Sequence, residues 1–91
     1  MVSIKEATAN AIAFAKGALE PEQTVGLRLE EVESTKVADQ DAWLITLSMI
    51  NTDNPLSAIT LPNAKRDYKI FTVLKSTGEV TSMKIRQLAA A

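Results

Sequence analysis

The residues of this chain that could carry chemistry are carboxylates that lie close together. Glu30, Glu31 and Glu33 fall within one short segment, and such a group could bind a hard cation or take part in acid–base catalysis. A calcium site, however, takes roughly six to eight oxygens from a curved loop, whereas these glutamates lie in a segment with the alternating pattern of an extended strand. We therefore interpret Glu30, Glu31 and Glu33 as a charged, solvated strand edge.

Asp39 and Asp41 form a second acidic pair. Their spacing is that of the start of a calcium-binding loop, but Ala42 and Trp43 follow, without the glycine and the distal glutamate that such a loop needs. Aspartate is also common in turns, because its side chain hydrogen-bonds to nearby backbone. We therefore assign Asp39 and Asp41 to a turn between two strands.

The composition excludes several classes of site. The chain has no cysteine and no histidine, which excludes disulfides, thiol nucleophiles, zinc sites built on those residues and histidine-based catalysis. Lysine, tyrosine and carboxylates are present, but no motif positions them for a reaction. We therefore expect a protein that is not an enzyme and that holds no cofactor and no metal.

Length and charge limit the remaining possibilities. The 91 residues have the length of one domain, and 10 basic against 11 acidic residues argue against general binding of nucleic acid. No apolar stretch approaches the roughly 20 residues that a membrane-spanning helix needs. The N-terminus lacks the pattern of a secretion signal. We expect a cytoplasmic protein that does not insert into membranes.

The N-terminal segment predicts a helix over about residues 3–19. Ser3 and Glu6 have the spacing of a capping box, and Pro21 ends the helical pattern. Apolar residues follow at steps of three and four, as on one face of a helix. These residues are Ile4, Ala7, Ala11, Phe14, Ala15, Ala18 and Leu19.

The rest of the chain predicts four strands, over about residues 24–34, 42–50, 66–74 and 80–86. The apolar phase shifts near Glu30, which indicates a bulge or a strand that leaves the core there. Gly78 lies where a short hairpin needs a positive φ. Because short turns join successive strands antiparallel, we predict a single α+β domain over residues 1–91. Its one N-terminal helix packs on a four-stranded antiparallel meander sheet.

The connection over residues 51–65 is long, and it is more apolar than expected for a loop that serves only to connect two strands. Leu56, Ile59 and Leu61 lie within it, and they form either an exposed recognition surface or a cover that folds back over the sheet. Connections of this length are often functional, so this loop is a candidate binding site.

The four aromatic residues also allow two readings. Trp43 and Tyr68 could line a ligand pocket, because aromatic rings with polar tips often anchor partners. With Phe14 and Phe71 they are the only aromatic residues of the chain. We expect at least three of the four to be buried in the core.

The run from Arg66 to Val73, followed by Thr77-Gly78-Glu79-Val80, resembles the closing hairpin of PepSY-like domains. The position of Trp43 and the alanine-rich leading helix are also similar to that family. The resemblance implies a small α+β interaction or inhibitory module. The element order is also similar to the cystatin-like fold, although Gln23-Thr24-Val25-Gly26 lacks one residue of the cystatin inhibitory loop and follows the helix directly.

The charges are divided between the two halves of the chain. Residues 1–54 carry nine acidic and four basic residues, whereas residues 55–91 carry two acidic and six basic residues. In a meander the first and fourth strands are the edges, so the three glutamates line one edge while Lys84 and Arg86 line the other. These charges either keep the edges soluble, or they direct head-to-tail pairing or select a bipolar partner.

Taken together, these features predict a small non-enzymatic interaction or regulatory module. It binds a protein partner, or a second copy of itself, through the 51–65 loop and the sheet edges. The alternative is a small-molecule ligand in a cleft between the helix and the sheet, where Ala7, Ala11 and Ala15 leave room.

Overall fold

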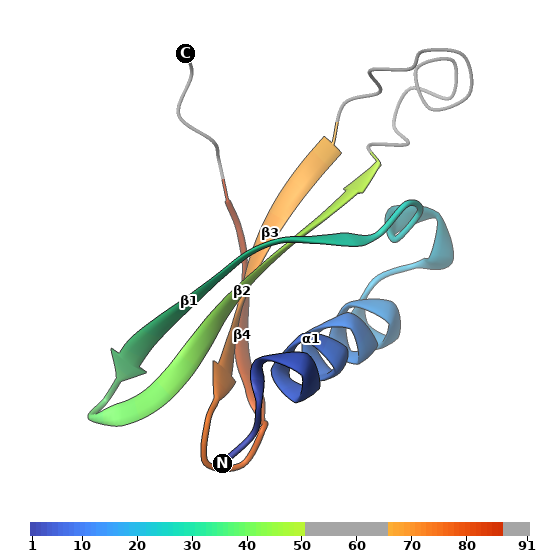
Figure 1. Cartoon of the computed structure of the whole chain (residues 1–91). Coiled ribbons are helices and arrows are strands. Elements are labelled where there is room, and N and C mark those ends of the chain that lie inside the picture. The colour runs from blue at the N-terminus through green and yellow to red at the C-terminus, as the bar shows by residue number, and fades with distance from the viewer. Residues whose placement is uncertain (51–65, 87–91) are drawn as a thin grey trace, which may run out of the picture.

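The chain folds as one helix packed on a four-stranded antiparallel sheet, as predicted (Figure 1). The structure, a computed structural model, describes residues 1–50 and 66–86. The strands lie in the order β1-β2-β3-β4, so β1 and β4 are the two edges of the sheet. The elements are α1 (Ile4–Ala18), the short 3₁₀ helix η1 (Pro21–Gln23), β1 (Arg28–Val37), β2 (Gln40–Ile50), β3 (Arg66–Leu74) and β4 (Val80–Ile85).

Helix α1 begins at the predicted capping box. The Glu6 backbone N–H donates to Ser3 Oγ over 3.1 Å, and the Ser3 backbone N–H donates to Glu6 Oε1 over 3.5 Å. Both bonds satisfy N–H groups that the helix itself leaves unpaired. The helix ends at Ala18, and the following residue, Leu19, is extended with φ −108°.

Two tight turns fix the register of the sheet. Ala38 and Asp39 join β1 to β2, and both have positive φ (49° and 65°), as a two-residue hairpin turn requires. At the β3–β4 turn, Gly78 has φ 78°, and its N–H donates to the Leu74 carbonyl over 2.8 Å. The predicted role of Gly78 is thereby confirmed.

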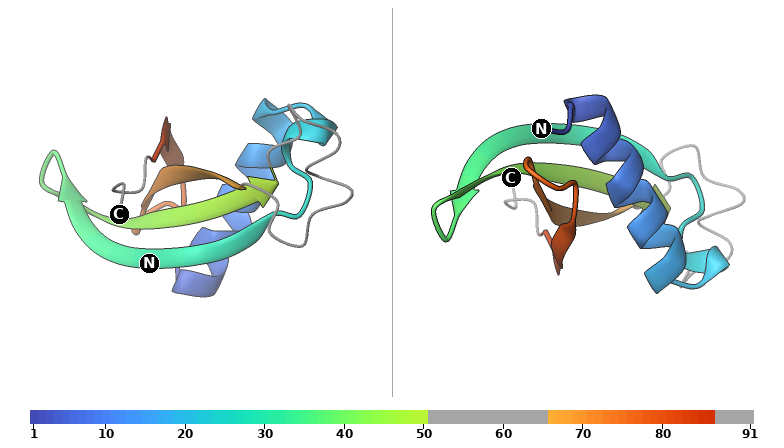
Figure 2. Two further views of the ribbon diagram at one scale, coloured as in Figure 1. Left: turned by 90° about the horizontal axis from the view of Figure 1, so that it is seen from above. Right: turned by 90° about the horizontal axis from the view of Figure 1, so that it is seen from below.

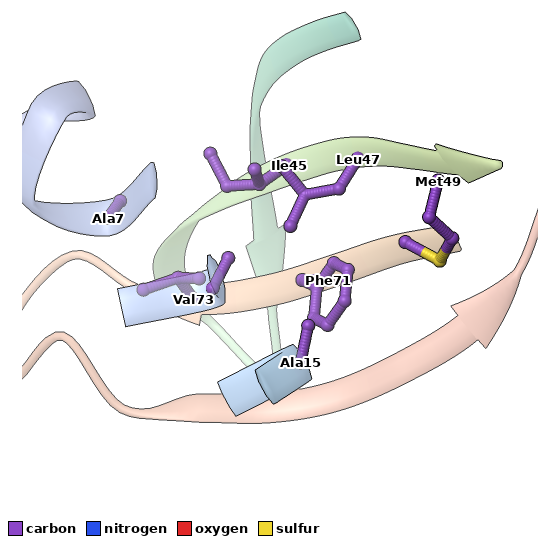
Figure 3. Close-up of a cluster of buried hydrophobic side chains, with 8 residues drawn as sticks. Ala7, Ala15, Ile45, Leu47, Met49, Phe71 and Val73 are labelled. Atoms are coloured by element: carbon purple, nitrogen blue, oxygen red, sulfur yellow. The ribbon is translucent and has the colours of Figure 1, made fainter. Parts of the chain in front are cut away.

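The core lies between α1 and one face of the sheet. Ala7, Ala11 and Ala15 are fully buried and pack against alternate side chains of β2 and β3. Because alanine has a small side chain, the helix backbone lies close to the sheet. The sheet side of this cluster, drawn in Figure 3, consists of Ile45, Leu47, Met49, Phe71 and Val73.

The first strand differs from its predicted bounds. The alternation of residues 24–34 predicted a strand from Thr24, but β1 begins at Arg28 and runs on to Val37. Pro21 starts η1 instead, and Gly26 has φ 65°, which interrupts an extended chain. The predicted bulge is present, because the register between β1 and β2 shifts between Leu29 and Glu31.

The aromatic residues are less buried than predicted. Only Phe71 is fully buried, whereas 39% of Phe14 is exposed and Trp43 and Tyr68 are half-buried. Phe14 lies at the side of the core, where its ring meets Phe71 edge-on at 6.2 Å between centroids. Tyr68 pairs with Ser48 across β2 and β3, so its side chain projects from the face opposite the helix. The expectation that at least three aromatic residues are buried was wrong.

Across residues 1–50 and 66–86, no helix has the length and apolar character needed to cross a membrane.

Candidate interaction surface

The two faces of the sheet are covered differently. Helix α1 packs on one face, and in the described part of the chain no helix lies on the other (Figure 2). We call the second face the open face. The register places these side chains on it: Arg28, Glu31 and Glu33 from β1, Leu44, Thr46 and Ser48 from β2, Tyr68, Ile70 and Thr72 from β3, and Ser82 and Lys84 from β4.

Three hydroxyl side chains are buried on this open face. The exposed fractions are 2% for Thr46, 0% for Ser48 and 9% for Thr72. A buried hydroxyl without a partner is costly, and each of these has one. Thr72 Oγ1, for example, accepts from Ser82 Oγ over 2.9 Å. The partners of Thr46 and Ser48 are long charged side chains, which lie over these two hydroxyls.

Glu30 is the centre of the first charged group. Ser48 Oγ donates to Glu30 Oε2 over 2.6 Å, and Arg28 Nε donates to the same oxygen over 2.7 Å. Arg66 lies 4.0 Å from that oxygen and donates from Nε to Ser48 Oγ over 2.8 Å. One carboxylate is thus held by two cations and a hydroxyl.

Arg66 ties three chain segments together. Only 15% of its side chain is exposed. Its Nη2 donates to the Ser48 carbonyl over 3.3 Å and also to the Gly26 carbonyl. These bonds connect the start of β3 with the end of β2 and with the turn before β1.

Glu31 and Arg86 form the second charged group. Arg86 Nη1 donates to Glu31 Oε1 over 2.8 Å and to Thr46 Oγ1 over 2.8 Å. The prediction placed these two charges on opposite edges of the sheet. The strand order agrees, yet the twisted sheet brings the two side chains together over the open face. The charges of the two halves of the chain therefore meet, at this pair, within one molecule.

The pKa values of the glutamates follow from these contacts. The hydrogen bond from Ser48, with that from Arg28, lowers the pKa of Glu30. The hydrogen bond from Arg86 lowers the pKa of Glu31. Glu33 shows the opposite effect, because its hydrogen bond to Glu31 and the charge of that carboxylate raise its pKa. The ionised form is thus favoured for Glu30 by Ser48 and Arg28, and for Glu31 by Arg86.

These carboxylates do not form a metal site. In residues 1–50 and 66–86, no group of three or more His, Cys, Asp or Glu side chains could hold a metal ion. Asp39 occupies the β1–β2 turn, and Asp41 lies 3.4 Å from Lys36 Nζ. The turn interpretation is correct for Asp39 and wrong for Asp41, which lies in β2 because that strand begins at Gln40, two residues before its predicted start.

The two edges of the sheet differ in charge. Strand β1 carries Arg28, Lys36 and all three glutamates, whereas the only charged residue of β4 is Lys84, which is exposed. Next to Lys84, Ile85 is 76% exposed. Ile85 is at one end of a row of residues that pair across the four strands. The row continues through Lys69 and Leu47 to Leu29 at the β1 edge. Leu29 is 43% exposed.

Trp43 has structural contacts. Lys75 Nζ lies 3.9 Å from the centroid of its ring, and the indole Nε1 donates to the Val2 carbonyl over 3.3 Å. Lys75 Nζ also donates to Ser34 Oγ over 2.6 Å. Trp43 thus joins the N-terminal segment to the β3–β4 turn, and these contacts do not indicate a ligand pocket.

The two remaining predicted sites are the 51–65 loop and the cleft between the helix and the sheet. Leu56, Ile59 and Leu61 lie outside the described residues, so the 51–65 loop stays a prediction. Ala7, Ala11 and Ala15 are packed against core side chains, and this packing does not favour a small-molecule site beside them.

Comparisons of the chain with protein-family models, with curated proteins and with solved structures found no match. The resemblance to PepSY-like domains therefore stays a prediction.

Sequence reasoning missed Ser48, Arg66 and Ile85. A signal for Ser48 was available, because Thr46 and Ser48 place hydroxyls on the second face of an otherwise apolar strand. Arg66 and Ile85 had no such signal. The contacts of Arg66 and the exposure of Ile85 both depend on where the ends of the strands lie in the folded chain.

Proposed function

We propose that this chain is a non-enzymatic module that binds a protein partner along the β4 edge of its sheet. The observation that carries the proposal is the 76% exposure of Ile85 on an edge strand with a single charged residue. A large exposed apolar side chain beside unpaired backbone groups favours association with another chain.

The core covers one face of the sheet, and side chains of the open face are paired with one another, which supports an edge as the binding site. The helix-covered face is closed by the core cluster around Phe71. On the open face, Glu30 and Glu31 are paired with arginine side chains, and the hydroxyls of Thr46 and Ser48 are hydrogen-bonded. A partner on that face would have to displace these ionic contacts.

The edge β1 is the less suitable of the two. It carries five charged residues in ten positions, and charge on an edge strand opposes pairing with another strand. Strand β4, at the other edge, has a single charged residue, Lys84. An extended segment of a partner can therefore add to β4, with backbone hydrogen bonds supplying affinity and side-chain contacts supplying specificity.

A capture experiment with matched variants tests this proposal. The full chain is immobilised as wild type, as Ile85→Lys and as Leu29→Lys, and the proteins retained from the native lysate are quantified by mass spectrometry. Both variants place a lysine at an exposed end of the same cross-strand row, at opposite edges. We expect a reproducible partner on the wild type and on Leu29→Lys that is lost on Ile85→Lys. Equal recovery on all three proteins, or no reproducible partner on any, would overturn the proposal.

A further inference from the structure

The β4 edge has a backbone pattern that permits pairing with another strand. The Arg86 N–H donates to the Tyr68 carbonyl over 2.8 Å, and the β3–β4 register pairs Ile70 with Lys84. Because hydrogen-bonded and non-hydrogen-bonded pairs alternate in an antiparallel ladder, the backbone groups of Lys84 face β3. Those of Met83 and Ile85 therefore face outward.

The side chains of this edge form an apolar strip on the helix side. Met83 pairs with Phe71 and Ile85 with Lys69, which places both side chains on the helix-covered face. Phe14 lies toward Met83, because its ring meets that of Phe71, the residue that pairs with Met83. Ile85 is 76% exposed and Phe14 39% exposed, while Met83 is half-buried.

From these features we infer that the partner at the β4 edge is a second copy of this chain. This inference rests on the proposed function and deepens it. The two β4 strands pair antiparallel about a two-fold axis that passes beside Met83. Their sheets join into one of eight strands, and both helices lie on the same face.

The sequence of β4 is complementary to itself in this register. Met83 opposes Met83 of the second copy, and Lys84 opposes Ser82, so the two lysines do not face each other. Ile85 opposes Thr81, which shields part of its exposed side chain. The outward backbone groups of Met83 and Ile85 gain partners from the second copy.

Charge and closure are also compatible with this pairing. Each chain has a net charge of −1, so long-range repulsion between two copies is weak. Pairing of β4 with β1 of another copy would be head-to-tail, which gives a larger ring or an open filament and does not close after two copies. It would also set β4 against five charged residues. The two-fold arrangement closes after two copies.

Cysteine cross-linking tests the inference, because the natural chain contains no cysteine. Paired residues on the two-fold axis have Cα atoms about 5.5 Å apart, within the range of a disulfide. We expect Met83→Cys to form a covalent dimer under mild oxidation. Ile85→Cys should not, since its two copies would lie about 13 Å apart at the strand rise. Val32→Cys, on β1, is the control for collisional cross-linking.

The mass of the unmodified full chain in solution provides the second measurement. An interface of one short strand is small, so we expect dimers to appear above roughly 10 µM to 100 µM in sedimentation or light scattering. Ile85→Lys should weaken the dimer at least about tenfold, and Leu29→Lys should leave it unchanged.

The outcomes separate the inference from the proposed function. A wild-type chain that stays monomeric to about 1 mM, or equal cross-linking at Met83→Cys and Val32→Cys, overturns the two-fold dimer. If the chain is monomeric but captures a different protein that Ile85→Lys fails to capture, the inference fails and the proposed function stands. Cross-linking at Ile85→Cys in place of Met83→Cys overturns the register.

Discussion

The two faces of this sheet are stabilised in different ways. On the helix-covered face, alanines of α1 pack against large apolar side chains of β2 and β3. The residues of this cluster are almost completely buried. On the open face, arginine and glutamate side chains reach across strands and bury the hydroxyls of Thr46 and Ser48. The comparison shows that a four-stranded sheet can close its second face with its own charged side chains. Under the proposed function, the strand edges are the part of the sheet left for a partner.

The largest expected difference between the faces is in core stability. Ile45 is fully buried on the helix-covered face, whereas its neighbour Leu44 is half-buried on the open face. We expect Ile45→Ala to lower the free energy of unfolding by about 3 kcal/mol and Leu44→Ala by about 1 kcal/mol. Urea unfolding of both variants measures this. Equal losses would contradict the distinction between the faces.

The attachment of the helix to the sheet predicts the next effect. Gly78 has φ 78°, and a Cβ there would lie 2.7 Å from Asn10 Nδ2. We expect Gly78→Ala to lower the free energy of unfolding by about 2 kcal/mol, from backbone strain and the clash with α1. Gly17→Ala is the matched control, because no atom lies within 4 Å of its added Cβ. That control should raise stability by about 0.5 kcal/mol. A neutral Gly78→Ala would show that the turn does not hold the helix.

On the open face, Ser48→Ala tests the hydrogen-bonded network. The substitution removes the strongest cause of the lowered pKa of Glu30, so we expect that pKa to rise toward its ordinary value in an NMR titration. The loss of the buried hydroxyl should cost about 1 kcal/mol. Ser82→Ala, whose hydroxyl contacts Thr72, should leave the pKa of Glu30 unchanged. A Glu30 pKa that shifts equally in both variants would contradict the network.

The smallest effect is expected at Glu33, and its sign depends on pH. The pKa of Glu33 is raised by Glu31, so its contribution to stability is present at low pH and is lost as the pH rises through the raised pKa. We therefore expect Glu33→Gln to stabilise the fold slightly near pH 7 and to have no effect near about pH 3, where the carboxyl group of Glu33, with its raised pKa, is protonated. Glu31 has a lowered pKa, so Glu31→Gln should destabilise near pH 7, and this loss should shrink as the pH falls through the lowered pKa. Thermal unfolding at both pH values, with added salt as the screening control, checks the signs.

Much of the fold could be predicted from local sequence signals. The capping box at Ser3 and the positive φ at Gly78 are each set by a few neighbouring residues, and both were predicted correctly. The start of β1 was not, because Val25, Leu27 and Leu29 alternate like a strand while Gly26 adopts a left-handed conformation that alternation does not reveal.

The interaction surface was less predictable. The strand order is that of the predicted meander, so the placement of the glutamates and of Lys84 on opposite edges was correct. The pair between Glu31 and Arg86 depends on the twist of the sheet, which residue spacing does not encode. The exposure of Ile85 depends on where α1 lies over the core, and only the assembled fold shows it.

Hydrogen exchange of the two edges, measured residue by residue, tests the central claim most directly. The two-residue turn makes Val37 and Gln40 a hydrogen-bonded pair, so the amides of Val32 and Ser34 face outward from β1 as those of Met83 and Ile85 do from β4. We predict that exchange at Met83 and Ile85 slows at least about tenfold as the chain associates with its partner, while exchange at Val32 and Ser34 does not change. Slower exchange on β1 alone, or no change on β4 while association is seen by mass, would contradict binding at the β4 edge.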